Sequence, residues 1–130
     1  MRASVHEIPI DKVSFQKTRE SFTRETVYAV SWSTRMRGML ARPRIYWHTR
    51  QLLISPCRAL HTIGMRYAID AAFIDRYGQV IAVVRDMPPF RIAVGPSGTY
   101  AVLERPSEKE QWIQVGDILK GDMNEALSTL

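Results

Sequence analysis

Cysteine and long hydrophobic runs are nearly absent from this sequence. One cysteine, Cys57, stands among 130 residues, so the chain cannot form a disulfide with itself. This excludes the small secreted scaffolds that disulfides hold together. The longest apolar runs span a few residues, far short of the ~20 needed to cross a bilayer, and residues 1–11 lack the apolar stretch of a signal peptide. We therefore expect a cytoplasmic protein with no membrane span.

Acidic residues are missing from a long central stretch. No Asp or Glu stands between Glu25 and Asp70. The formal net charge of +5 is uneven as a result: residues 1–60 hold 11 basic and 4 acidic residues (+7), whereas residues 61–130 hold 7 and 9 (−2). Arginine outnumbers lysine 14 to 4, and guanidinium groups suit phosphate and carboxylate recognition better than ammonium groups do.

The basic stretch Arg35–Arg58 has two interpretations. It contains Arg35, Arg37, Arg42, Arg44, Arg50 and Arg58. With Trp32, Tyr46 and Trp47 interleaved, it could bind nucleic acid through phosphate contacts and base stacking. The same charges could instead form a solvated basic face. No known nucleic-acid motif accompanies them, so nucleic acid ranks last among the partners we consider.

What is present is the composition of one globular domain: 45% hydrophobic and 24% charged residues, with 7 Gly and 7 Pro. Short β-rich segments alternate with turn residues, which predicts a mainly β, single-domain antiparallel β-sandwich or partly open barrel with one or two short helices. We expect an arm over residues 1–25, the β domain over 26–120 and a tail over 121–130. The predicted strands are 13–15, 26–32, 51–54, 69–74, 79–84 and 99–104, and the predicted helices are 33–42, 107–113 and 122–130. A hairpin turn is predicted at Asp75-Arg76-Tyr77-Gly78.

Cys57 and His61 are the weak catalytic candidates. A thiolate nucleophile needs a base that is oriented by a third group, and Asp70 supplies that residue type nearby. The alternative function is thus a Cys/His-dependent hydrolase or transferase, although buried, unreactive cysteines are common. Zinc requires three or four protein ligands, and the remaining histidines, His6 and His48, show no motif spacing, so we expect neither a metal nor a cofactor.

A polar pocket within the β domain is the preferred site. Its candidate ligand-binding residues are Arg37, His61, Thr62, Asp70 and Glu104. A few convergent polar groups in an apolar domain are typical of a ligand site. Each residue also has a structural interpretation: Thr62 as a backbone partner, Asp70 as a turn cap or a partner of Arg37 or Arg66, and Glu104 as a buried carboxylate that pairs with an arginine of the basic stretch.

The order of several short motifs resembles the DUF192 (UPF0127) family over about residues 26–120. These are Arg35-Met36-Arg37-Gly38-Met39-Leu40, then Cys57-Arg58-Ala59-Leu60-His61-Thr62-Ile63-Gly64-Met65, then Ile69-Asp70-Ala71-Ala72-Phe73-Ile74-Asp75. Later blocks follow in the same order: Gly78-Gln79-Val80, Pro88-Pro89, Val102-Leu103-Glu104 and Val115-Gly116-Asp117. The chain departs from the family at Ala68, where proline is usual, and at Arg105-Pro106-Ser107-Glu108, where a glycine turn is usual.

The resemblance implies a compact antiparallel β domain with no assigned enzyme activity. It marks the pocket residues given above and five structural positions: Gly38, Gly64, Met65, Gly116 and Asp117. It also suggests a protein partner such as a pilus or secretion component, while the polar pocket itself suggests a small anionic ligand. The preferred hypothesis is therefore a small non-enzymatic binding or accessory domain, whose polar pocket lies around His61, Asp70 and Glu104.

Overall fold

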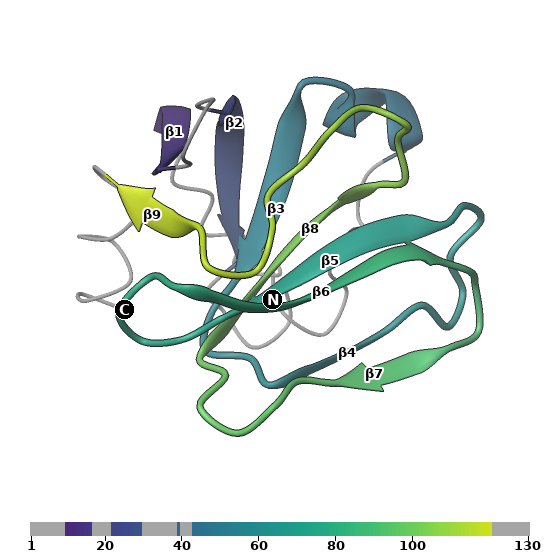
Figure 1. The fold of residues 1–130 in the computed structure, drawn as a ribbon. Helices are drawn as coiled ribbons and strands as arrows, with labels where there is room; N and C mark the ends of the chain where they lie inside the picture. The colour runs from purple at the N-terminus through teal and green to yellow at the C-terminus, as the bar shows by residue number, and fades with distance from the viewer. Residues whose placement is uncertain (1–9, 17–21, 30–38, 40–42, 121–130) are drawn as a thin grey trace, which may run out of the picture.

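The computed structural model describes residues 10–16, 22–29, 39 and 43–120, and it consists mainly of antiparallel β-strands (Figure 1). The strands are β1 (Ile10–Gln16), β2 (Phe22–Ala29), β3 (Arg50–Ile54), β4 (Ala59–His61), β5 (Ile69–Ile74), β6 (Val80–Met87), β7 (Ile92–Val94), β8 (Ala101–Pro106) and β9 (Ile118–Lys120). Seven strands form one sheet in the order β6-β5-β8-β3-β2-β1-β9, and β4 and β7 form a second sheet of two strands. The pairing of β2 with β3 is parallel. The prediction of a mainly β, antiparallel domain is confirmed.

The large sheet curls until its two edges meet at one end. An isolated bridge joins Gln79, just before β6, to Ile118 in β9. The backbone N–H groups of Leu119 and Val80 extend this contact by donating to the carbonyl oxygens of Gly78 and Asp117, each over 2.9 Å. In Figure 1 the loop between β5 and β6 accordingly lies beside β9. Because one bridge joins the edges, the described strands form a partly open barrel and not a closed one.

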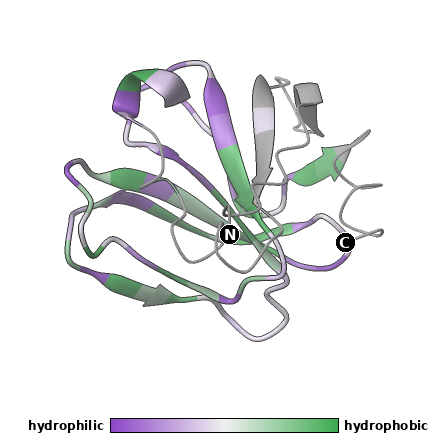
Figure 2. Cartoon of the chain, turned by 180° about the vertical axis from the view of Figure 1, so that it is seen from behind, coloured by the Kyte–Doolittle hydropathy of each residue, from purple (hydrophilic) through white to green (hydrophobic). Residues whose placement is uncertain are grey.

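Successive side chains along each strand point to opposite faces of the sheet, and in the central strands both sets are apolar, so the sheet has two apolar faces. One face buries a cluster of Leu53, Ala72, Ile74, Val80, Ala101, Leu103, Trp112, Ile113 and Leu119. The other buries a cluster of Met39, Trp47, Leu52, Ile54, Leu60, Met65, Ile69, Ala71, Phe73, Met87 and Val102. The segment after β8 covers the first face, and the β4–β7 sheet with the turn at Trp47 covers the second. Green hydrophobic stretches therefore run through the central strands in Figure 2.

The hairpin between β5 and β6 forms as predicted. The carbonyl of Asp75 accepts the Gly78 N–H at 3.1 Å. The Asp75 carboxylate accepts the N–H groups of Tyr77 and Gln79, each at 2.9 Å. Gly78 has φ 87°, a conformation that favours glycine over residues with a side chain. Asp75 therefore fixes the turn through its side chain.

Several predicted elements differ from those observed. The described helix is one 3-10 turn, η2 (Arg44–Trp47), and residues 107–113 are irregular where a helix was predicted. Three arginines hold that segment through its carbonyl groups, as described below, which an α-helix would use internally. Strand β2 begins four residues before the predicted strand 26–32. It therefore includes residue 25, which was predicted to end the N-terminal arm. The predicted helices at 33–42 and 122–130 lie outside the described residues, except for Met39, which is buried.

No helix within the described ranges combines the length and apolar character of a membrane span.

Candidate functional site

Asp70 and Glu104, two residues of the predicted pocket, lie on opposite faces of the sheet. Asp70 pairs with Arg105 across β5 and β8, while Glu104 pairs with Ala71. Residues directly opposite each other in an antiparallel pair share a face, and neighbours along a strand do not. Asp70 thus faces the first apolar cluster, and Glu104 faces the second. His61 is exposed on β4, in the small sheet. The structure therefore does not bring these three residues together.

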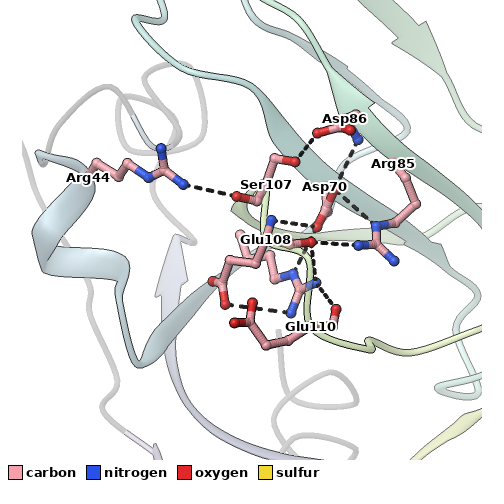
Figure 3. Close-up of polar contacts among 8 residues, drawn as sticks. Arg44, Asp70, Arg85, Asp86, Ser107, Glu108 and Glu110 are labelled. Atoms are coloured by element: carbon pink, nitrogen blue, oxygen red, sulfur yellow. Dashed lines mark hydrogen bonds and ion pairs between the residues drawn. The ribbon is translucent and has the colours of Figure 1, made fainter.

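The fully buried carboxylate of Asp70 is held by four donors (Figure 3). Its Oδ1 accepts the backbone N–H of Asp86 at 2.9 Å and lies 3.1 Å from Nε of Arg85. Its Oδ2 accepts Nε of Arg105 at 2.9 Å and the Glu108 N–H at 3.4 Å. Arg105 is buried as deeply as Asp70, whereas the Arg85 side chain is 44% exposed. Asp70 therefore pairs with Arg85 and Arg105 and not with Arg66, one of its two predicted partners. The other predicted partner, Arg37, lies outside the described residues.

Three arginines hold the segment 107–110 by its backbone carbonyls. Arg44 of η2 donates to the carbonyl of Ser107 at 3.0 Å, and Arg85 of β6 donates to that of Glu108 at 2.7 Å. Arg105 donates to the carbonyl of Glu110 at 2.8 Å. The Ser107 hydroxyl also donates to the carboxylate of Asp86. These contacts come from η2, β6 and β8, so three distant parts of the chain hold the segment.

An open cleft of about 850 Å³ lies between η2, the end of β6 and the segment 106–110. It is lined by Arg44, Ile45, His48, Arg85, Asp86, Pro106, Ser107, Glu108, Lys109 and Glu110. Arg44, Arg85 and Lys109 bring positive charge from three different parts of the chain. Among the acidic groups, Asp86 is bonded to Ser107 and Glu108 lies 3.9 Å from Arg105. Glu110 is exposed, so the lining holds three basic and three acidic side chains, and the cations come from η2, β6 and the segment 106–110.

Glu104 is the second buried carboxyl group of the domain. No ion pair between described residues includes it, and burial raises its pKa from 4.5 to about 8. The Tyr67 hydroxyl is buried on the same side, without a hydrogen-bond partner among the described residues. Burial and the charge of Glu104 both raise the pKa of Tyr67. Arg44 lies over the Tyr67 ring at 5.8 Å from its centroid. The predicted arginine partner of Glu104 is not among the described ion pairs.

Cys57 and His61 each have local backbone partners. The Cys57 thiol donates to the carbonyl of Ala59 at 2.9 Å, and Nδ1 of His61 accepts the Ile63 N–H at 3.2 Å. Asp70 is the residue considered as the third group of a catalytic triad. Both of its carboxylate oxygens already accept two donors each, so neither is available to orient His61. The described contacts thus give the histidine no carboxylate partner of the kind that a nucleophilic mechanism requires.

Thr62 has the backbone role considered for it. Its hydroxyl donates to the carbonyl of Pro88 at 2.6 Å and accepts the Arg91 N–H at 2.9 Å. Thr62 also accepts the N–H of Phe90 at its own carbonyl over 3.1 Å. It thereby fixes the loop that enters β7.

The marked structural residues form turns and core. Gly64 and Gly116 have φ 85° and 96°, and Met65 is buried in the second apolar cluster. The Asp117 carboxylate closes the turn at Gly116 by accepting the Gln114 N–H at 2.8 Å. Gly38, like Arg37, lies outside the described residues.

Comparison with known proteins identifies the family. The DUF192 family ("Uncharacterized ACR, COG1430") matches residues 13–122, which is most of the chain. The chain belongs to the DUF192 family. The match begins earlier than the predicted resemblance and includes part of β1. No curated protein is significantly similar to the chain.

Two crystal structures share the fold of this DUF192 protein. One, from Sinorhizobium meliloti, is described as a "putative transcription regulator"; it is 18% identical, with TM-score 0.78 over 92% of this chain and 98% of that chain. The other, a protein of unknown function from Novosphingobium aromaticivorans, is 15% identical, with TM-score 0.74 over 88% of this chain and 85% of that chain. At these identities the similarity concerns the fold.

Sequence reasoning missed Arg85, Arg105 and Tyr67 as members of the polar clusters. Arg85 and Arg105 stand in strands whose facing and pairing were unknown, so nothing in the sequence joined them to Asp70. One signal was available: the departure from the family pattern at Arg105 falls immediately before the segment that these arginines hold.

Proposed function

We propose that this DUF192 protein is a non-enzymatic binding domain that takes a small anion or the carboxyl terminus of a peptide in the cleft beside Asp70. The observation that carries this proposal is the set of basic side chains from η2, β6 and the segment 106–110 around one cleft of about 850 Å³. Guanidinium and ammonium groups are the usual partners of phosphate and carboxylate. Of the predicted pocket residues, Asp70 lies beside the proposed site, whereas His61 and Glu104 do not belong to it.

The buried network supports the proposal by compensating the charge of Asp70 beside the cleft. Asp70 and Asp86 would repel an anion, but the first is neutralised by Arg105 and Arg85 and the second accepts the Ser107 hydroxyl. Arg85 links the two regions, because it binds Asp70 and is half-exposed beside the cleft. The network thus places the Arg85 guanidinium at the cleft, whose lining also includes the carboxylates of Asp86, Glu108 and Glu110.

The two alternative functions have weaker support. Cysteine-dependent catalysis would need a base oriented by a group other than Asp70, whose oxygens are occupied. Nucleic-acid binding draws support from the neighbour described as a "putative transcription regulator". Three arginines of the basic stretch in this chain, at positions 35, 37 and 42, lie outside the described residues, however. Both remain predictions, as do the cytoplasmic location and a pilus or secretion partner.

Titration calorimetry with two short peptides that differ only at the C-terminus tests the proposed function. We expect the free carboxylate peptide to bind at least about tenfold more tightly than the amide, because a charged hydrogen bond contributes about 1.5–3 kcal/mol. Inorganic phosphate should compete with it. The double variant Arg44→Ala/Lys109→Ala should lose about tenfold in affinity.

Arg76→Ala is the matched control, since it removes an exposed arginine from the β5–β6 turn. Equal affinity for carboxylate and amide peptides, or equal loss in the control and in the double variant, would contradict the assignment of the site.

A further inference from the structure

The small β4–β7 sheet exposes an apolar face that the cleft does not use. Ile92 and Val94 lie opposite His61 and Ala59, and all four side chains are exposed. Ile63 and Phe90 stand at one end of this sheet. The large apolar side chains of the patch are Ile63, Phe90, Ile92 and Val94, which are 50%, 68%, 70% and 75% exposed. Contiguous exposed apolar residues of this kind mark interaction sites.

The charge around this patch has one sign. The two segments that build it, residues 57–68 and 87–98, contain no Asp or Glu. They contain three arginines, Arg58, Arg66 and Arg91, and all three are exposed. Within these two segments, the exposed apolar side chains are therefore accompanied by basic residues and by no carboxylate.

Phe90 is held in place at a conformational cost. Its φ is 62°, in the left-handed region that a bulky side chain rarely adopts. Thr62 fixes it there by accepting the N–H groups of Phe90 and Arg91 and by donating to Pro88. Strain of this kind persists where the surrounding structure enforces it and is concentrated at functional sites. Among the described residues, no contact buries the Phe90 ring, which is 68% exposed, so burial does not offset the conformational cost.

We propose that the β4–β7 patch docks onto an anionic phospholipid surface, with Phe90 and Ile92 entering the interface and the three arginines binding lipid phosphates. A second copy of the chain would place the arginines of both copies together and be repelled. Two segments without any carboxylate match a surface that is uniformly negative over an apolar interior. Apolar insertion together with basic residues is the usual pair of signals for reversible membrane binding.

Sedimentation of the full-length protein with lipid vesicles tests this proposal. We expect binding to vesicles of equal parts phosphatidylcholine and phosphatidylglycerol at low salt, weakening as salt rises, and little binding to pure phosphatidylcholine. Phe90→Ser should weaken binding by about tenfold. Arg91→Ala should weaken it by about fivefold, as expected for one arginine near an anionic surface.

Tyr77→Ser is the matched control, because Tyr77 is 75% exposed but lies in the β5–β6 turn. It should bind anionic vesicles like the wild type. Absence of binding, equal binding to both vesicle types, or equal loss in Tyr77→Ser and Phe90→Ser would overturn the proposal. Binding to poly-glutamate that equals lipid binding and is unaffected by Phe90→Ser would also overturn it, in favour of an acidic protein partner. None of these outcomes bears on the cleft, because the two sites share no residue.

Discussion

At the scale of single residues, Asp70 and Glu104, two of the buried carboxyl groups in the described part of the chain, have opposite environments. Asp70 accepts four donors and two of its partners are arginines, so its charge is compensated where it is buried. Glu104 has apolar neighbours and no described ion pair, and burial raises its pKa to about 8. The same residue class therefore stabilises the fold as an anion on one face of the sheet and as a neutral acid on the other.

The environment of Glu104 predicts a pH-dependent stability. Because its folded pKa of about 8 is above the unfolded value of 4.5, the folded state retains a proton that the unfolded state releases between these pH values. The contribution of Glu104 is thus fully present below about pH 4.5 and lost progressively as the pH rises to about 8. Urea unfolding across this range should show that decline in the wild type.

The variant Glu104→Gln should remove this decline and be more stable than the wild type at pH 7, by about 2 kcal/mol. Glu110→Gln, at an exposed position, serves as the control and should keep the wild-type profile. A marked loss of stability in Glu104→Gln at pH 7 would instead show that a cation, such as the predicted arginine, sits against the carboxylate.

At the scale of elements, the Asp70 network joins β5, β6 and β8 to the segment 107–110. Asp70→Ala should destabilise the domain by roughly 3–5 kcal/mol, because it removes the buried carboxylate that pairs with the buried guanidinium of Arg105. Urea unfolding measures this directly. Glu110→Ala, which removes an exposed carboxylate from the segment that Arg105 holds, should change stability by less than about 0.5 kcal/mol. If Asp70→Ala cost no more than Glu110→Ala, the network would not hold this segment in place.

The elements also show what local sequence determines and what it does not. Strand β5 was predicted at its observed bounds, and the Asp75–Gly78 turn formed as expected, because alternation and turn chemistry are local. Strands β4 and β7 were missed because each has three residues, too few to show a period. The irregular segment 107–113 was predicted as a helix because its acidic first turn favours one, and contacts from distant arginines override that preference.

At the scale of the whole molecule, the sequence predicted the fold class and the family but not the assembly of the site. Asp70 and Glu104 were grouped because both are acidic residues in motif blocks, yet the pairing of β5 with β8 places them on opposite faces. That pairing depends on contacts between residues 27 to 37 positions apart. The partners of Asp70, Arg85 and Arg105, are likewise selected by register across the sheet.

The central claim is that the cleft beside Asp70 binds a small anion or a peptide carboxylate. The most direct test is a backbone NMR titration of the full chain with a short peptide that has a free C-terminal carboxylate, with inorganic phosphate as a second probe. We predict saturable shifts of the amides at residues 44–48, 85–86 and 107–110, and reduced shifts with the amidated peptide. Shifts centred on His61 and Thr62, or none in any of these segments at saturating peptide, would contradict the account.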